Sequence, residues 1–98
     1  MPAPNLHVSR HPAILHKLAI LRDVRTEPKK FRELVRELSW LLGYEALADV
    51  GVRPLDIRTP MEPMTAHQLG ERIGLVPILR AGLGMVDAML ELMPTAEV

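Results

Sequence analysis

The sequence contains no cysteine, which excludes disulfide bonds, thiolate nucleophiles and thiolate metal sites. This absence also fits a reducing compartment, so we expect a cytoplasmic protein. Net charge is absent too, because twelve basic side chains balance twelve acidic ones. No overall electric field therefore draws the chain to a nucleic-acid backbone or to an anionic membrane, and any anion-binding site must be local.

Aromatic side chains are scarce and long apolar runs are missing. One Trp, one Tyr and one Phe occur in 98 residues, so the sequence offers no basic surface interleaved with aromatic side chains, as RNA-binding domains have. The longest apolar stretches, residues 75–79 and 83–93, fall far short of the ~20 residues of a membrane helix. We expect neither a nucleic-acid partner nor a membrane partner.

The first half of the chain is predicted to be helical. Residues 1–10 form an arm, and apolar side chains then recur at helical spacing over residues 11–49. Within this region we expect a long amphipathic helix over residues 27–49, with Thr26 as its N-cap. Trp40 lies off the apolar stripe of this helix, and we expect it to cover a subunit contact.

Strands and a hairpin are predicted over residues 53–79. Residues 54–60 alternate apolar and polar side chains, as a half-buried strand does. Residues 61–70 contain proline and glycine, and we expect a flexible hairpin tip there. Residues 73–79 form an almost unbroken apolar run, which is the pattern of a strand buried on both faces of a parallel sheet.

The candidate chemistry lies where this strand meets the next helix, at residues 80–84 (RAGLG). A helix over residues 85–93 and the start of a strand at residues 96–98 complete the outline of a βαβ crossover. Helix N-termini at the carboxyl ends of parallel strands bind anions, glycine permits close backbone approach, and Arg80 adds a planar pair of donors. Spacing alone leaves two interpretations open, a phosphate or pyrophosphate site and a tight structural turn beside a surface arginine.

The wider sequence resembles a known family. Residues 76–87 resemble the pyrophosphate loop of uracil phosphoribosyltransferases, and further matches lie upstream in the family's order: His11-Pro12, His16-Lys17-Leu18, Leu21-Arg22-Asp23, Phe31-Arg32-Glu33-Leu34 and Tyr44-Glu45-Ala46. The resemblance covers residues 11–98. It implies an α/β fold, a partial phosphoribosyltransferase-type parallel sheet flanked by helices, with N-terminal helices and a β-hairpin arm. Residues 1–98 would then be the N-terminal portion of a single domain whose C-terminal remainder is absent.

The resemblance also implies an activity, that of a pentosyltransferase (a glycosyltransferase) of pyrimidine salvage. Uracil and phosphoribosyl pyrophosphate would give UMP and pyrophosphate, with Mg²⁺ on the phosphates and GTP as an activator. Arg80 would be catalytic, and the pyrophosphate would be bound by the following residues: Arg80, Ala81, Gly82 and Leu83. No metal ligand is expected in this chain, and the family resemblance implies a homodimer or a higher homo-oligomer.

The sequence also departs from the family pattern. The signature for phosphoribosyl pyrophosphate, an apolar strand followed by an acidic pair and a Thr-Gly-Gly-Ser-like loop, does not occur, nor do the uracil-binding hood and a second pyrophosphate arginine. We therefore expect the chain by itself to be inactive. The alternative is a non-enzymatic assembly or regulatory module of phosphoribosyltransferase-like fold in which Arg80 is structural. Binding of pyrophosphate through Arg80 distinguishes the two.

Overall fold

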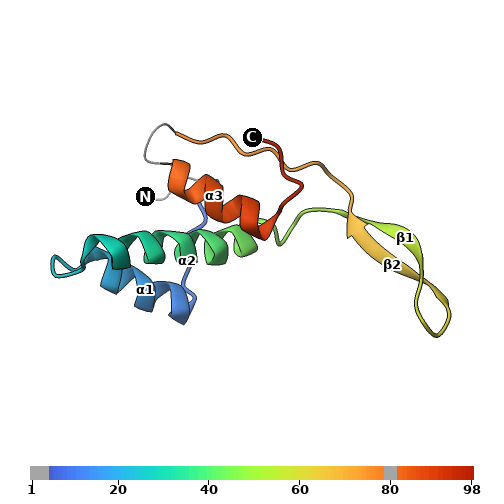
Figure 1. The fold of residues 1–98 in the computed structure, drawn as a ribbon, viewed down its shortest axis with the longest axis horizontal. Helices are drawn as coiled ribbons and strands as arrows, with labels where there is room; N and C mark the ends of the chain where they lie inside the picture. Colours follow the sequence, from blue (N-terminus) through green and yellow to red (C-terminus); the bar gives the residue numbers. More distant parts are fainter. Residues whose placement is uncertain (1–4, 79–81) are drawn as a thin grey trace.

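The computed structural model describes residues 5–78 and 82–98, which form three helices and a two-stranded antiparallel hairpin (Figure 1). In chain order the elements are α1 (Pro12–Arg22), α2 (Pro28–Ala46), β1 (Val52–Arg58), β2 (Pro63–Leu69) and α3 (Leu83–Leu92). Helix α2 packs against both α1 and α3, and the hairpin projects away from the three helices. The molecule is consequently elongated, with extents of 54 × 34 × 29 Å.

Helix α1 begins at a proline, as the sequence predicts. Pro12 has no N–H group to leave without a partner, and Nδ1 of His11 accepts a hydrogen bond from the Ala13 N–H at 3.1 Å. Ile14 is the buried residue of this helix. Helix α1 therefore starts with a side-chain cap and buries a single apolar side chain.

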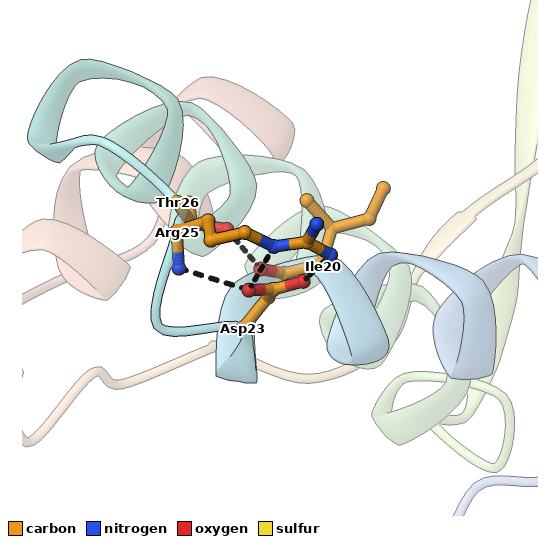
Figure 2. A network of polar contacts seen from close by, with 4 residues as sticks. All are labelled: Ile20, Asp23, Arg25 and Thr26. Atoms are coloured by element: carbon orange, nitrogen blue, oxygen red, sulfur yellow. Dashed lines mark hydrogen bonds and ion pairs between the residues drawn. The ribbon is translucent and has the colours of Figure 1, made fainter.

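A polar turn connects α1 to α2 (Figure 2). The Asp23 carboxylate accepts hydrogen bonds from Arg25, at 2.8 Å from its backbone N–H and at 3.1 and 2.7 Å from its guanidinium. These hydrogen bonds lower the pKa of Asp23, and those from the Arg25 side chain have the larger effect. The prediction that Thr26 caps α2 is wrong: its hydroxyl donates to the Ile20 carbonyl at the end of α1, and Glu27 holds the N-cap position without a side-chain cap bond.

Helix α2 carries the core of the described structure. Leu34 and Leu38 are buried, and the buried Ser39 hydroxyl is satisfied by donating to the Val35 carbonyl at 2.7 Å. The helix ends at Ala46 rather than at residue 49 as predicted, because the following three residues form turns. Its predicted amphipathic character is confirmed.

The hairpin is longer than the sequence predicts. Strand β1 pairs with β2 in a continuous antiparallel register from Val52↔Leu69 to Arg58↔Pro63. Residues 63–69, predicted to lie in a flexible tip, are instead strand β2, and the tip is confined to residues 59–62. There the Thr59 hydroxyl accepts two backbone N–H groups of the turn and donates to the Glu62 carbonyl at 2.7 Å. This network fixes the turn, so the tip is short and structured.

The predicted parallel sheet does not form within residues 5–78 and 82–98. A parallel pairing occurs there as a single bridge, between Gly74 and Glu97. In the rest of the predicted strand Val76 and Ile78 are 95% and 82% exposed. A parallel strand needs hydrogen-bonded neighbours along its length, and the described residues provide one for a single position. The expected α/β sheet is thus replaced by helices and an antiparallel hairpin.

Candidate functional site

The predicted anion-binding loop lies between the extended segment that ends at residue 78 and the start of α3. Arg80 and Ala81, two of the four predicted site residues, lie outside the described residues. The other two are Gly82, which is the N-cap of α3, and Leu83, which is its first helical residue. The prediction that the helix begins beside the loop is confirmed, and the helix starts two residues earlier than residue 85.

Gly82 makes a close backbone contact with Ile78. Its N–H donates to the Ile78 carbonyl at 2.8 Å, and its own carbonyl accepts the Val86 N–H at 3.1 Å. A Cβ atom at this position would lie 2.9 Å from the Ile78 oxygen and 3.0 Å from the Ile78 nitrogen. The site therefore requires glycine for space, because its φ of −77° is accessible to any residue.

The N-terminus of α3 offers hydrogen-bond donors to the loop. The first N–H groups of a helix have no acceptor within the helix, and they carry its partial positive charge. No side chain caps α3, because its N-cap residue is Gly82. The amides of Leu83 and Gly84 accordingly point toward the loop end of the helix, where an anion would complete their hydrogen bonding.

Helix α2 contacts α3 in the half of α3 that lies farther from the loop. The indole Nε1–H of Trp40 donates to the Ala88 carbonyl at 3.0 Å, and Ala88 is fully buried. A guanidinium nitrogen of Arg36 lies 3.6 Å from a carboxylate oxygen of Glu91. The predicted subunit contact of Trp40 stays a prediction, and the structure places the Trp40 indole against α3.

A different reading of the sequence could have found this contact. Trp40 and Gly43 lie three residues apart, so they share one face of α2. A large side chain next to a glycine on one helix face is typical of a close helix crossing. The structure shows that Gly43 is covered by the Met89 side chain, one residue after the carbonyl that Trp40 contacts.

A cavity of about 300 Å³ lies between the first half of α2 and the start of α3. It is lined by Phe31, Arg32, Val35, Arg36, Gly84 and Asp87.

Within residues 5–78 and 82–98, no three His, Asp or Glu side chains gather in a way that could hold a metal ion. None of the three helices is both long enough and apolar enough to cross a membrane.

Comparison with known proteins identifies the family. The family model "Uracil phosphoribosyltransferase" matches residues 8–98. This chain belongs to the uracil phosphoribosyltransferase family. It is 60% identical over 91 residues to the uracil phosphoribosyltransferase of Roseiflexus castenholzii and 51% identical over 94 residues to that of Desulfitobacterium hafniense. These matches cover 93% and 95% of the chain, but 44% and 45% of the two relatives.

A solved structure supports the fold. The AQ2163 protein from Aquifex aeolicus superposes with a TM-score of 0.84 at 37% identity, over 95% of this chain and 45% of that one. The three helices and the hairpin are therefore a partial uracil phosphoribosyltransferase fold. The chain spans a little under half the length of the relatives it matches.

Proposed function

We propose that this chain supplies the pyrophosphate-binding part of a uracil phosphoribosyltransferase of pyrimidine salvage. The observation that carries the proposal is the family match over residues 8–98, which includes the loop at residues 80–84. The close turn at Gly82 and the uncapped start of α3 support it, because both suit a loop that wraps an anion. The complete enzyme would convert uracil and phosphoribosyl pyrophosphate to UMP and pyrophosphate.

In this reaction the bond between ribose C1 and the pyrophosphate oxygen breaks while a bond from C1 to a uracil nitrogen forms, and that nitrogen loses its proton. Negative charge accumulates on the departing pyrophosphate as C1 becomes cation-like. We assign to Arg80 the stabilisation of that charge by its guanidinium, and to Ala81 and Leu83 the donation of backbone N–H groups. Gly82, whose N–H already donates to the Ile78 carbonyl at 2.8 Å, contributes the close approach of its backbone. Donors held in place by a helix stabilise the transition state without first having to reorganise.

Magnesium would neutralise phosphate charge when it is bound. As the family resemblance implies, we place the ion on the phosphates of the substrate, and we assign no residue of this chain to it. Activation by GTP is an extension of the proposal from the family resemblance, and we assign no residue to it.

We further propose that the protein acts as a homodimer or a higher homo-oligomer in the cytoplasm. The hairpin supports self-association, because Leu55, Ile57 and Met64 are 39%, 38% and 48% exposed. Ile57 pairs with Met64, and Leu55 lies two residues from Ile57, so the three side chains share one face of the hairpin. An exposed apolar face of this kind suits a contact with another subunit.

A reconstitution experiment tests the proposed activity. The 98-residue chain is mixed with the C-terminal part of the Roseiflexus castenholzii relative, starting after the position that aligns with Val98, and UMP formation is measured by chromatography. We expect UMP from the mixture and none from either part alone. Failure of every mixture, together with failure of the 98-residue chain to bind pyrophosphate in calorimetry, would favour the non-enzymatic assembly module.

A further inference from the structure

Helix α3 is attached to α2 through its second half. Trp40 donates to the Ala88 carbonyl at 3.0 Å, and Arg36 pairs with Glu91 at 3.6 Å. Between these two contacts, Met89 covers Gly43 so closely that a Cβ atom on Gly43 would overlap its sulfur. Ala88, Met89 and Glu91 all lie in the last five residues of α3. Their contacts with Trp40, Gly43 and Arg36 hold this end of the helix against α2, and we call these three contacts the clamp.

The first half of α3 is packed more loosely. The cavity of about 300 Å³ separates Gly84 and Asp87 from the start of α2. A Cβ atom added to Gly84 would meet a single atom within 4 Å, the Val35 Cγ1 at 3.9 Å, which is ordinary van der Waals distance. The start of α3 therefore has room to move relative to α2, whereas its end does not.

This arrangement makes the clamp a pivot. Gly82 lies six residues before Ala88, which is about 9 Å along a helix that rises 1.5 Å per residue. A tilt of about 10° at Ala88 would displace the start of the helix by roughly 1.5 Å. Displacements of about 1 Å in positioning groups can lower enzymatic rates about a hundredfold. A small change in the tilt of α3 at the clamp therefore produces a larger displacement at the loop end of the helix.

We propose that Trp40 is a positioning residue that sets the tilt of α3 and so directs the amides of Leu83 and Gly84 at the pyrophosphate. The Ala88 carbonyl has two lone pairs, so it can accept the indole N–H in addition to its own helical bond. Trp40 acts through α3, because its hydrogen bond is to the Ala88 carbonyl of that helix. The inference rests on the proposed function, since it takes the loop at residues 80–84 to be the anion site.

The test compares two variants of the 98-residue chain, each of which alters one 3.0 Å hydrogen bond made by α2. Trp40→Phe removes the bond to Ala88 in α3, and Glu37→Gln weakens the bond from Lys17 in α1. Inorganic pyrophosphate is titrated into each protein by calorimetry, and urea unfolding is measured in parallel. We expect Trp40→Phe to weaken pyrophosphate binding about threefold to tenfold, the equivalent of one hydrogen bond, and Glu37→Gln to leave it unchanged.

A second measurement needs no variant. Trp40 is the only tryptophan of the chain, so indole fluorescence reports on this clamp alone. We expect the emission to change on addition of pyrophosphate, with the dissociation constant found by calorimetry. Binding with no change in emission and with equal affinity in both variants would overturn the role of Trp40 and leave the proposed function standing. Absence of pyrophosphate binding in the unsubstituted chain would overturn the anion site, and the inference with it.

Discussion

Gly74 and Glu97 lie side by side in parallel, on either side of the crossover that contains α3. The Leu75 N–H donates to the Glu97 carbonyl at 2.6 Å, and the Glu97 N–H donates to the Ile73 carbonyl at 2.9 Å. A strand, a helix and a second strand thus follow one another as in a βαβ unit, although the ladder has a single position. This bridge ties together the chain before and after α3, and it leaves the neighbouring apolar residues at an exposed edge.

Substitution at this edge should reduce self-association of the 98-residue chain. Val76 is 95% exposed beside the bridge, and extended apolar segments with exposed backbone pair readily with other chains. We expect Val76→Lys to lower the association constant in sedimentation velocity over a concentration series. Val24 is 98% exposed in the turn after α1, so Val24→Lys is the matched control and should have no effect. Equal effects of the two variants would mean that general surface charge, rather than this edge, controls association.

The helices could be predicted from the sequence because their signals are local. The first helix follows from Pro12 and a recurring apolar spacing, and the second from a sustained amphipathic pattern. The predicted parallel sheet does not form within the described residues, and the reason is physical. An apolar run such as residues 73–79 indicates that a strand is suited to burial, but the strands and helices that would bury it come from other parts of a fold.

The candidate site was also predictable only in part. The glycine at residue 82 was identified from its position in a strand-to-helix turn, and the structure adds that a side chain there would collide with Ile78. Trp40 was assigned to a subunit contact because it lies off the apolar stripe of α2. Its indole N–H bonds a carbonyl 48 residues away. The spacing of Trp40 and Gly43 on α2 indicates a close helix crossing, but it does not say which helix supplies the acceptor. The assignments of Arg80 and Ala81 stay predictions.

The Asp23 carboxyl should titrate below the ordinary aspartate pKa of about 3.9. Hydrogen bonds from the Arg25 side chain and backbone stabilise its charged form, which lowers its pKa. The contribution of this turn to stability is therefore complete above pH 3.9 and is lost as the pH falls through the lowered pKa. Carbon-detected NMR titration of the Asp23 carboxyl should show the shift, and Arg25→Ala should return the pKa toward the ordinary value. An unshifted pKa in the unsubstituted chain would contradict the contact.

Bulk added at Gly43 should loosen α3. A Cβ atom there would overlap the Met89 sulfur and approach the Leu92 side chain to 3.4 Å, so Gly43→Val forces both to move. Overpacking of this kind typically costs about 1–3 kcal/mol of unfolding free energy, which urea unfolding can measure. Gly51→Val is the control, because a Cβ atom at Gly51 would meet nothing nearer than a Glu71 carboxylate oxygen at 4.0 Å. Similar losses for the two variants would show that α2 and α3 are not closely packed.

Removal of the Arg80 side chain should lower the rate of the reconstituted enzyme. Losing one preorganised donor to the departing pyrophosphate typically costs about 3 kcal/mol, so we expect Arg80→Ala to reduce kcat by about a hundredfold or more. Arg80→Lys should recover only part of the rate, because an ammonium group cannot present a planar pair of donors. Arg72→Ala is the control: this arginine is 91% exposed and pairs with Glu97 at 3.5 Å, so its loss should leave kcat unchanged. If Arg80→Ala retains near-normal kcat/KM in steady-state assays, Arg80 is structural and the site assignment is wrong.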